Sequence, residues 1–374
     1  MRSLSIKKCL MKIFQVIPNL GSGGAERFVV DLSNELAQQG HDVTLLTLYD
    51  LVGTHGFYKD EIDGKVRVVS FHKSLGLSIR NIIKVAQFIR KEKPDIIHSH
   101  VGALQYTIIP QVLLGKGVHT VHNEAQLEAS GKLEVLLRKL VFKFGLVQAV
   151  TISPESHDSF VRFYKREAPL IMNGRAISGE IKANEKVNSE INQYKKSTQS
   201  RVIVQLARFQ PQKNIPMMAR VAKRLYDENY DFTLLFIGST ENEQIVSEVT
   251  QYMPPCAHIL GERMNPLEYL KEADAFALSS EYEGMPISLI EALAVGAVPV
   301  CTPVGGIPNA IVDGKNGFLS HDASEKAYYE TLKRFFTTDS DHLRQMSVNA
   351  KESFSAYSME ECAKKYQQLY GKLK

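Results

Sequence analysis

"KIFQVIPNLGSGGAERFVVDLSNELAQQGHDVTLLTL", Lys12 to Leu48, decides the fold. It contains an apolar strand, a glycine-rich turn, an amphipathic helix that ends at Gly40, and a second apolar strand. Two near-continuous apolar strands joined by a helix form a βαβ unit, which places both strands in one parallel sheet covered on both faces.

The alternation of strand and helix repeats along the chain. Further strands are predicted at "VRVVSF", "PDIIHSH", "KGVHTVHN" and "LVQAVTISPES" and, after the polar residues 182–200, at "RVIVQLAR", "FTLLFIG", "AHILG", "DAFALSS" and "VPVCT". The 374 residues suffice for two cores, since single cores stop growing near ~250–300 residues. The pattern predicts an α/β protein of two doubly wound, Rossmann-like domains.

The domains are predicted at residues 1–182 and 201–357, with a polar linker at 183–200. A loose extension is expected at residues 1–10, which carry lysines where a signal peptide needs an apolar run. The last helix, residues 358–374, could close on either domain, the N-terminal one included. No segment reaches the ~20 apolar residues that a membrane span needs.

The net charge of +4 is unevenly distributed. Residues 1–182 hold 24 Lys and Arg against 17 Asp and Glu, and the remainder holds 21 against 24. The basic half favours an anionic partner, such as phosphate groups or a membrane surface, although a solvated surface explains it equally well. The basic residues are spread out and no binding motif accompanies them, which argues against nucleic acid.

Two basic amphipathic segments, "IRNIIKVAQFIRKEK" and "KLEVLLRKLVFKFG", suit docking on an anionic membrane surface. The alternative is that each packs its apolar face on the sheet. The four cysteines are scattered without ligand or disulfide spacing, which favours a cytoplasmic protein.

Ligands of open parallel sheets bind outside the carboxyl ends of the strands, and two such domains place the site in a cleft between them. The loop after the first strand, "NLGSGGAER", lacks the dinucleotide fingerprint, because Glu26 stands where a glycine is required, and it lacks a P-loop lysine. Gly23 and Gly24 still permit close backbone approach to a ligand beside a helix N-terminus.

"HTVHN" places His122 at a strand end, where a catalytic and a structural role are both open. His98 and His100 form an H-x-H pair that no neighbouring ligand completes, so no metal site is predicted.

In the second half, "LARFQPQKN" places Arg208 and Lys213 in a loop before a helix. Two fixed positive charges there suit a diphosphate, and a solvated basic loop is the alternative.

"EYEGMPISLIEALAVGAVPVCTPVGG" runs from Glu281 to Gly306. Pro286 is predicted as the first helical residue, so Glu283 lies in the loop before the helix and Glu291 lies inside it. The two carboxylates are then roughly 10 Å apart, at ~1.5 Å of rise per residue, which exceeds the ~5–9.5 Å of paired glycosidase carboxylates. They suit two ends of one elongated ligand, and Gly305 and Gly306 form the next strand-to-helix turn.

These segments resemble the family 4 glycosyltransferases, nucleotide-sugar-dependent enzymes of the GT-B fold, in which two Rossmann-like domains face a cleft. The resemblance covers nearly the whole chain and rests most specifically on the two glutamates with their surroundings. The other matching segments are "GGAER", "HTVHN", "ISP", "IMNG", "ARFQPQKN" and "VGGIPNAIVDGKNGFL". It implies a retaining transfer from a UDP-, GDP- or ADP-sugar to a glycan or lipid-linked acceptor in bacterial surface polysaccharide or lipopolysaccharide synthesis, without a metal or other cofactor.

Carried onto this sequence, the resemblance assigns the diphosphate to Arg208 and Lys213, the donor-sugar hydroxyls to Glu283, and the ribose to Glu291. It implies that His122 and the backbone of Gly23 and Gly24 line the reaction centre, so His122, Glu283, Arg208 and Lys213 are the expected catalytic residues. The remaining expected donor-site residues are Gly284, Met285, Pro286, Ile287, Gly305 and Gly306.

The chain departs from the family pattern in two places. Ala207 stands where many relatives have glycine, and the segment Glu124–Gly145, where acceptor contacts would fall, matches nothing assignable. A non-hydrolysing nucleotide-sugar epimerase and a non-catalytic nucleotide-sugar-binding protein remain alternatives.

Overall fold

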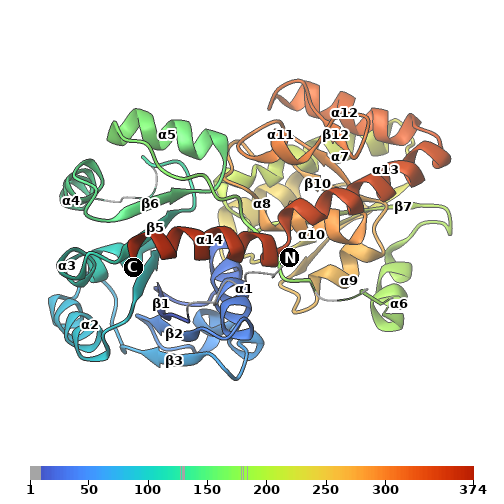
Figure 1. Ribbon diagram of the computed structural model, residues 1–374. Helices are drawn as coiled ribbons and strands as arrows, with labels where there is room; N and C mark the ends of the chain where they lie inside the picture. The colour runs from blue at the N-terminus through green and yellow to red at the C-terminus, as the bar shows by residue number, and fades with distance from the viewer. Residues whose placement is uncertain (1–9, 127, 129–130, 178, 180, 183) are drawn as a thin grey trace, which may run out of the picture. The chain divides into compact units, whose positions relative to one another are not determined.

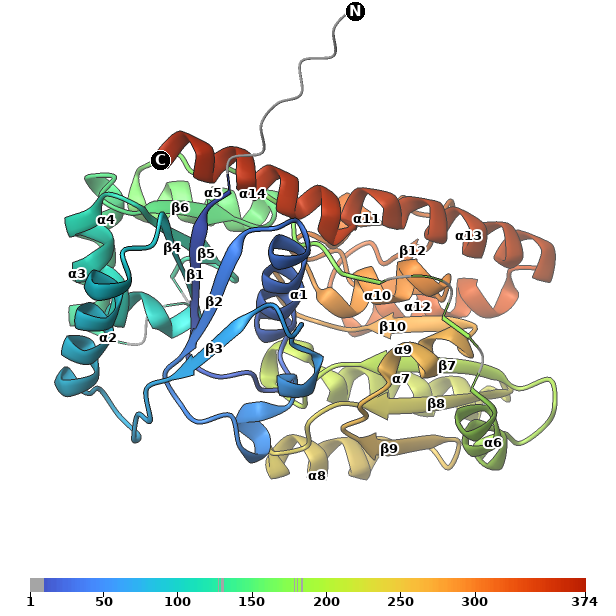
Figure 2. The ribbon, with the colours of Figure 1, turned by 60° about the horizontal axis from the view of Figure 1, so that its bottom comes forward.

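The structure, a computed structural model, describes residues 10–126, 128, 131–177, 179, 181–182 and 184–374. The extension expected at residues 1–10 therefore lies outside the described residues, apart from Leu10. The chain forms two compact units (Figures 1 and 2). The first runs to Ile152 and adds Ser156–Ile171 and Met359–Lys374, and the second holds Ser153–Glu155 and Met172–Ser358.

The first unit contains a parallel sheet of six strands in the order β3-β2-β1-β4-β5-β6. The strands are β1 (Lys12–Ile17), β2 (Asp42–Thr47), β3 (Arg67–Ser70), β4 (Ile96–His100), β5 (Gly117–Val121) and β6 (Gln148–Thr151). The helices are α1 (Gly24–Gln38), α2 (Ile79–Glu92), α3 (Leu104–Leu114), α4 (Lys132–Lys143), α5 (Pro154–Tyr164) and the C-terminal α14 (Met359–Leu373). Short 3₁₀ helices span Gly53–Gly56, Lys59–Glu61 and Val101–Ala103.

The two faces of this sheet are packed differently. Phe14 and Val16 of β1 form an apolar core with Val85 and Ile89 of α2 and with Tyr106 of α3. On the other face, beneath α1 and α14, the strands present buried polar side chains. These are Gln15, His98, His100 and Thr120, and α14 meets them with Tyr366 and Tyr370. The C-terminal helix thus completes the first unit.

The second unit contains a parallel sheet in the order β12-β11-β10-β7-β8-β9. The strands are β7 (Arg201–Leu206), β8 (Phe232–Ile237), β9 (Ala257–Gly261), β10 (Ala275–Leu278), β11 (Val298–Cys301) and β12 (Phe318–Leu319). The helices are α6 (Glu185–Tyr194), α7 (Ile215–Asp227), α8 (Glu243–Tyr252), α9 (Pro266–Lys271), α10 (Ile287–Val295), α11 (Ile307–Ala310), α12 (Glu325–Thr337) and α13 (Ser340–Ser353). Short 3₁₀ helices span Pro211–Lys213 and Phe354–Tyr357.

The predicted fold class, two parallel α/β sheets, is confirmed. The region between the units differs from the linker expected at 183–200. Helix α6 occupies its centre, because Val187 and Ile191, four residues apart, bury one face and the Asn184 side chain caps the helix start. The first unit ends at Ile171, so residues 172–182 belong to the second unit. None of the helices in the described part of the chain is both long and apolar enough to cross a membrane.

Candidate functional site

Three loops of the second unit follow neighbouring strands. β7, β10 and β11 are adjacent in the sheet, and residues 207–214, 279–286 and 302–306 lead from them into α7, α10 and α11. Because the strands are parallel, the three loops lie on one edge of the sheet. These loops hold the predicted second-unit site residues, apart from Ile287 and Glu291, which belong to α10.

An ion pair between Lys213 and Glu283 ties the first two loops together. The Lys213 Nζ lies 2.5 Å from Glu283 Oε1, and Ser280 Oγ donates to the same oxygen at 2.6 Å. Gln212 Nε2 donates to the Tyr282 carbonyl at 2.8 Å and lies 3.4 Å from Glu283 Oε2. The Glu283 side chain is only 5% exposed. A carboxylate held this way keeps one orientation and has lone pairs left for hydroxyl donors.

Arg208 supplies a second positive charge on this edge. Its side chain is exposed and forms no hydrogen bond or ion pair with any other residue that the structure describes. Helix α7 begins just beyond, after Asn214, whose φ of 44° ends the loop in a left-handed conformation. The first amides of a helix carry partial positive charge. An unpaired guanidinium, a paired ammonium and a helix N-terminus together suit a diphosphate.

Gly305 and Gly306 bring the third loop against the second. Gly305 has a φ of +57°, and a Cβ on it would lie 2.1 Å from the Glu283 carbonyl oxygen. The Gly306 N–H donates to the Gly284 carbonyl at 2.6 Å. The close approach predicted for these glycines toward a ligand is, in this structure, an approach to the chain's own backbone. Their predicted contact with a donor stays a prediction.

The start of α10 differs slightly from the prediction. Pro286 is the residue before the helix rather than its first residue, because its ψ of 124° is extended, and α10 begins at Ile287. The predicted placement of the two glutamates is confirmed, since Glu283 lies in the loop and Glu291 lies inside the helix. Met285 faces inward and is buried.

Glu291 has its own buried partner, Arg175. The Arg175 Nε donates to Glu291 Oε1 at 2.8 Å, and the two side chains are 5% and 7% exposed. Asn173 Nδ2 donates to the Met285 carbonyl at 3.0 Å, so the segment around Arg175 fastens onto α10. Arg175 was not predicted from the sequence, and its only signal was its position directly after "IMNG". The partners described for the two glutamates differ, as expected for two separate hydrogen-bonding points.

Gly23, Gly24 and His122 belong to the first unit. Gly23 precedes α1 and Gly24 is its first residue. A Cβ on Gly23 would lie 2.0 Å from Glu26 Oε2, so the Glu26 carboxylate folds back over this glycine. A carboxylate there is favourable because it faces the positive end of the helix dipole. The chain's own Glu26 carboxylate thus lies where the close approach of a ligand was expected, and the predicted contact of these glycines with a ligand stays a prediction.

His122 directly follows β5, and its hydrogen bonds fix the position of its proton. Gln15 Nε2 donates to the Tyr370 hydroxyl, which orients the amide so that its oxygen faces His100. Gln15 Oε1 therefore accepts from His100 Nε2–H at 2.8 Å. Burial holds the pKa of His100 well below its usual value, so His100 is neutral. Its Nδ1 therefore accepts from His122 Nε2–H at 3.0 Å. This leaves the His122 Nδ1 as an acceptor with no hydrogen-bond partner among the described residues.

His122 is also neutral at pH 7. Burial is the main cause that lowers the pKa of His122 to about 4, against the opposing charge of Glu128. A neutral imidazole that keeps one acceptor nitrogen can orient a hydroxyl group but cannot serve as an acid there.

Glu128 anchors the backbone at His122. Its carboxylate accepts from the His122 N–H and from Arg138 at 3.0 Å, and Arg138 also bonds to Glu134 at 2.9 Å. Burial raises the pKa of Glu128, but the hydrogen bond from His119 and the charge of Arg138 outweigh it and lower the pKa overall. Glu128 and Arg138 lie in the segment that matched no motif, so sequence reasoning missed both.

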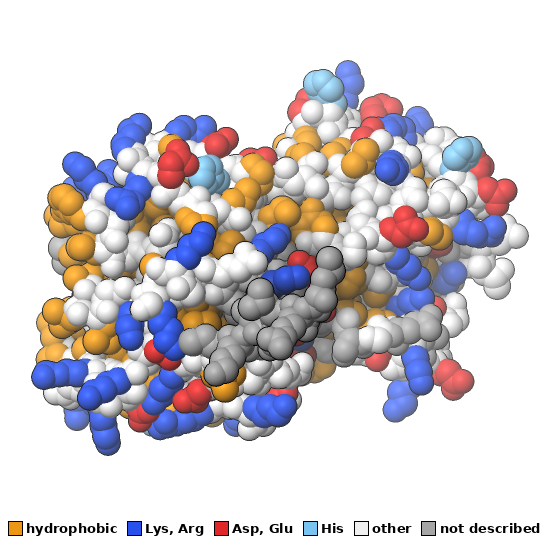
Figure 3. Space-filling view, in the orientation of Figure 1, with side chains coloured by type: hydrophobic (Ala, Val, Ile, Leu, Met, Phe, Trp, Pro, Cys, Tyr) orange, Lys and Arg blue, Asp and Glu red, His pale blue; other side chains and the backbone are white. Residues whose placement is uncertain are grey.

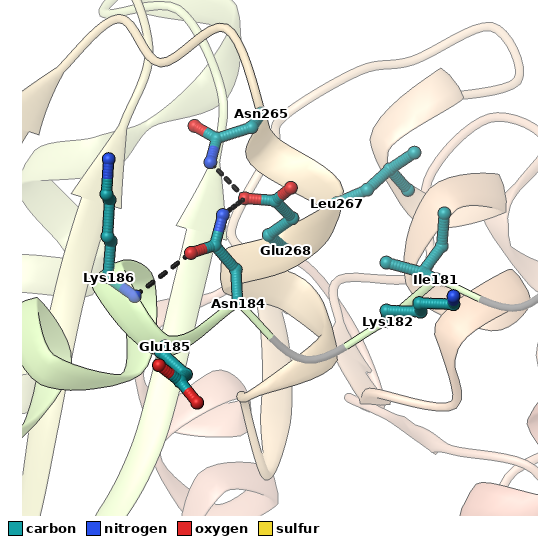
Figure 4. Close-up of a pocket in the computed structure, with 8 residues that line it drawn as sticks. All are labelled: Ile181, Lys182, Asn184, Glu185, Lys186, Asn265, Leu267 and Glu268. Carbon is teal, nitrogen blue, oxygen red and sulfur yellow. Dashed lines mark hydrogen bonds between the residues drawn. The ribbon is translucent and has the colours of Figure 1, made fainter.

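Two further features bear on what this chain can bind. Among the described residues, no group of three His, Cys, Asp or Glu side chains is arranged to hold a metal ion. A surface pocket of the second unit lies between the start of α6 and α9, where Asn184 donates to Glu268 at 2.7 Å (Figure 4). None of the predicted site residues lines it.

Comparisons with known proteins point to one family. The model described as "Glycosyltransferase Family 4" matches residues 22–174, and "Glycosyl transferases group 1" matches residues 186–353. The chain is 23% identical to the N-acetyl-alpha-D-glucosaminyl L-malate synthase of Bacillus anthracis, with 94% of each chain covered. It is 22% identical to a Campylobacter jejuni alpha-1,4-N-acetyl-D-galactosaminyltransferase, with 98% of this chain and 99% of the relative covered.

A solved structure shares the fold. Anabaena HepE, crystallised with UDP and glucose, superposes with a TM-score of 0.81 at 17% identity, and the match covers 96% of this chain and 99% of that one.

Proposed function

Because the chain belongs to glycosyltransferase family 4 and is a glycosyltransferase, we propose that it transfers a sugar from a nucleoside diphosphate sugar to a hydroxyl of a lipid-linked saccharide, with retention of configuration. The proposed process is the synthesis of a bacterial surface polysaccharide. The name of the Campylobacter relative describes transfer onto an undecaprenol-diphosphate-linked saccharide, and the Anabaena structure holds UDP and glucose. Both support the proposal.

The observation that carries the proposal is the edge formed by Lys213, Glu283 and Arg208. The buried carboxylate fixes the lysine ammonium, and the Arg208 guanidinium, from the loop after β7 on the same edge of the sheet, has no partner among the described residues. In the proposed complex, Arg208 binds diphosphate oxygens bidentately and Lys213 acts as a point charge. Both then stabilise the negative charge that develops on the leaving group, where fixed charges have the largest effect on the rate.

In the proposed reaction the bond between the anomeric carbon and the diphosphate oxygen breaks. A bond from the acceptor oxygen forms on the same face of the sugar. The acceptor proton passes to the departing phosphate oxygen, so the nucleoside diphosphate leaves and no protein nucleophile is needed. Glu283 hydrogen-bonds to donor-sugar hydroxyls, Glu291 to the ribose, and the His122 Nδ1 to a sugar hydroxyl. No metal is required, because Arg208 and Lys213 supply the positive charge.

The first experiment identifies the donor by thermal shift with UDP-, GDP- and ADP-sugars. A donor at 100 times its dissociation constant adds ~2.7 kcal/mol to the free energy of unfolding, which shifts the melting temperature measurably. The donor that binds is then incubated with an undecaprenol-diphosphate-linked saccharide, and NMR gives the anomeric configuration of the product. An inverted product contradicts retention, and loss of transfer in excess chelator contradicts metal independence. Conversion of the donor without any acceptor indicates an epimerase instead.

A further inference from the structure

Exposed apolar side chains of the first unit gather on one helix layer. Twelve of the twenty exposed large hydrophobic residues in the described part of the chain lie between residues 75 and 146. They are Leu75, Leu77, Ile79, Ile83, Ile109, Leu113, Leu114, Leu136, Leu137, Leu140, Phe144 and Leu146. They belong to α2, α3 and α4 and the turns beside them, and Figure 3 shows hydrophobic side chains along the edge that these helices form.

The spacing of these residues shows that they form outward stripes. Ile79 and Ile83 on α2 lie four residues apart, as do Ile109 and Leu113 on α3, so each pair shares one helix face. The same helices already bury a different face against the sheet. The outer side of such a helix is normally polar, yet the Leu113 side chain is 78% exposed. Exposed apolar residues that gather on one helix layer, rather than lying scattered singly, mark an interaction site.

The same segments are strongly basic. Residues 75–93, 104–116 and 132–146 hold ten Lys and Arg against two glutamates. Both glutamates are already neutralised, since Glu92 pairs with Lys12 at 2.6 Å and Glu134 pairs with Arg138 at 2.9 Å. Lys84, Lys132 and Lys143, in contrast, are exposed and form no ion pair with any residue that the structure describes. The twelve apolar residues and these three lysines are called the docking face below.

We propose that the docking face binds the surface of an anionic phospholipid bilayer. The inference deepens the proposed function, since a lipid-linked acceptor lies in such a bilayer. Protein–protein interfaces are enriched in aromatic residues and Arg and depleted in Lys, whereas this face combines Leu and Ile with Lys. On a bilayer, the aliphatic side chains enter the headgroup–acyl boundary. The lysines extend their stems along the apolar surface and place their ammonium groups at lipid phosphates.

The test is flotation of the full chain with vesicles of phosphatidylcholine alone and of phosphatidylcholine with phosphatidylglycerol. We expect flotation with the anionic vesicles only, and less of it as salt increases, because ions screen surface charge. Ile79→Ser/Leu113→Ser/Leu140→Ser removes one apolar contact from each helix and should reduce flotation. Lys84→Glu/Lys143→Glu reverses two charges and lowers the partition coefficient by about tenfold or more, since each basic residue near the surface contributes appreciably.

Matched controls come from the second unit. Met264→Ser/Val312→Ser/Val348→Ser removes three apolar side chains that are 60%, 59% and 45% exposed, and Lys315→Glu/Lys326→Glu reverses two exposed charges. Both controls should float like the wild type. Equal flotation with neutral and anionic vesicles, or an equal loss in the control variants, overturns the proposal. A dimer in sedimentation of the wild type that is absent from the triple apolar variant also overturns the proposal, because the face then binds a second copy.

The flotation needs neither donor nor acceptor, so its result is independent of the proposed reaction. Transfer to a short-chain, water-soluble acceptor should be unchanged in the docking-face variants, while transfer to an acceptor in anionic vesicles falls. Loss of both activities means that the face is structural and contradicts the proposal. Flotation without any sugar transfer contradicts the proposed function but still supports membrane binding by the docking face.

Discussion

Lys213 is held by a carboxylate 70 residues further along the chain. The pair is largely buried, which keeps the ammonium in place before any ligand arrives. A donor phosphate then competes with Glu283 for the ammonium, and the freed carboxylate can accept from sugar hydroxyls. The positions of Lys213, Arg208 and Glu283 were predictable because each follows a predicted strand. The contacts of Gln212 with Glu283 and of Arg175 with Glu291 were not, because only folding brings those segments together.

Removing the Lys213 ammonium should lower the rate strongly. We expect Lys213→Ala to reduce kcat by roughly 10²–10³-fold, the usual effect of losing one group that stabilises leaving-group charge, with Lys213→Arg recovering part of it. Steady-state assays of sugar transfer measure this. Lys223→Ala is the control, since Lys223 pairs with Asp227 on the exposed face of α7. Equal rates for Lys213→Ala and the wild type would falsify the diphosphate assignment.

The buried pair of Arg175 and Glu291 should show strong coupling. Arg175→Met leaves a buried carboxylate without its cation, so we expect the free energy of unfolding to fall by roughly 3–5 kcal/mol. Arg175→Met/Glu291→Met should recover most of this loss. Urea denaturation of the single and double variants measures the coupling, and additive losses would show that the two residues act independently.

The matched control for this cycle is an exposed pair. Arg334 and Asp313 are 47% and 44% exposed, so Arg334→Met should cost no more than about 1 kcal/mol.

At the scale of elements, helices with an amphipathic pattern were predictable, whereas the apolar helix α3 was not. The segment of α3, "LQYTIIPQVLL", has apolar residues on all sides and Pro110 inside it, so it shows no helical period. The strands β4 and β5 were predicted as buried, but the sequence did not explain why one face of them carries polar side chains. His98 and Thr120 are buried there because Tyr370 and Tyr366 of α14 satisfy them, at 2.7 Å and 2.9 Å. No local sequence pattern predicts a hydrogen-bond partner so distant in sequence.

The loop of Gly305 allows a test with a matched glycine. Gly305 and Gly314 both have positive φ, +57° and +74°, but a Cβ on Gly314 meets nothing within 4 Å. Gly314→Ala should cost about 1–2 kcal/mol, the ordinary penalty of the left-handed conformation. Gly305→Ala should cost clearly more and should also lower activity, because the new Cβ displaces the loop of Glu283. Thermal unfolding and transfer assays measure both, and equal costs would contradict the proposed contact.

The histidines of β4 and β5 should make the first unit sensitive to acid. The pKa values of His98, His100, His119 and His122 are all lowered, mainly by burial. The unfolded chain therefore binds more protons below its histidine pKa of ~6.5, so stability falls as the pH drops from ~6.5 toward 4. Each histidine contributes at most about 1.4 kcal/mol per pH unit.

Urea denaturation between pH 7.5 and 4.5 measures this dependence. His122→Asn should flatten it, whereas His321→Asn should not, because the His321 side chain is 95% exposed. Stability that is constant over this range would contradict the neutral state of the cluster.

At the scale of the whole molecule, the first unit is built from both ends of the chain. α14 returns to it after the second unit is complete, which puts Tyr366 and Tyr370 against α1 and the sheet. The sequence predicted a terminal helix that could close on either domain, and only packing decides between them. The sequence also placed the boundary in the polar stretch near residue 183, because polarity marks a linker, whereas here that stretch folds as α6.

Truncating Tyr370 should destabilise the first unit. The side chain is fully buried, so Tyr370→Ala should lower the free energy of unfolding by roughly 3–5 kcal/mol. Tyr252→Ala is the control, since Tyr252 is 37% exposed on α8 of the second unit, and it should have a much smaller effect. Thermal denaturation measures both. Similar losses for the two variants would mean that α14 is dispensable to the first unit.

The return of α14 also determines the order in which the protein can fold as it leaves the ribosome. The segment Met172–Ser358 is synthesised between the two parts of the first unit. At ~5–20 residues per second, this delays α14 by roughly 10–40 s. During that interval the sheet of the first unit lacks its C-terminal cover, and the polar side chains of Gln15, His98 and Thr120 lack their tyrosine partners. The second unit is therefore the first that can finish folding during translation, and a chain that stops before Met359 cannot complete the first unit at all.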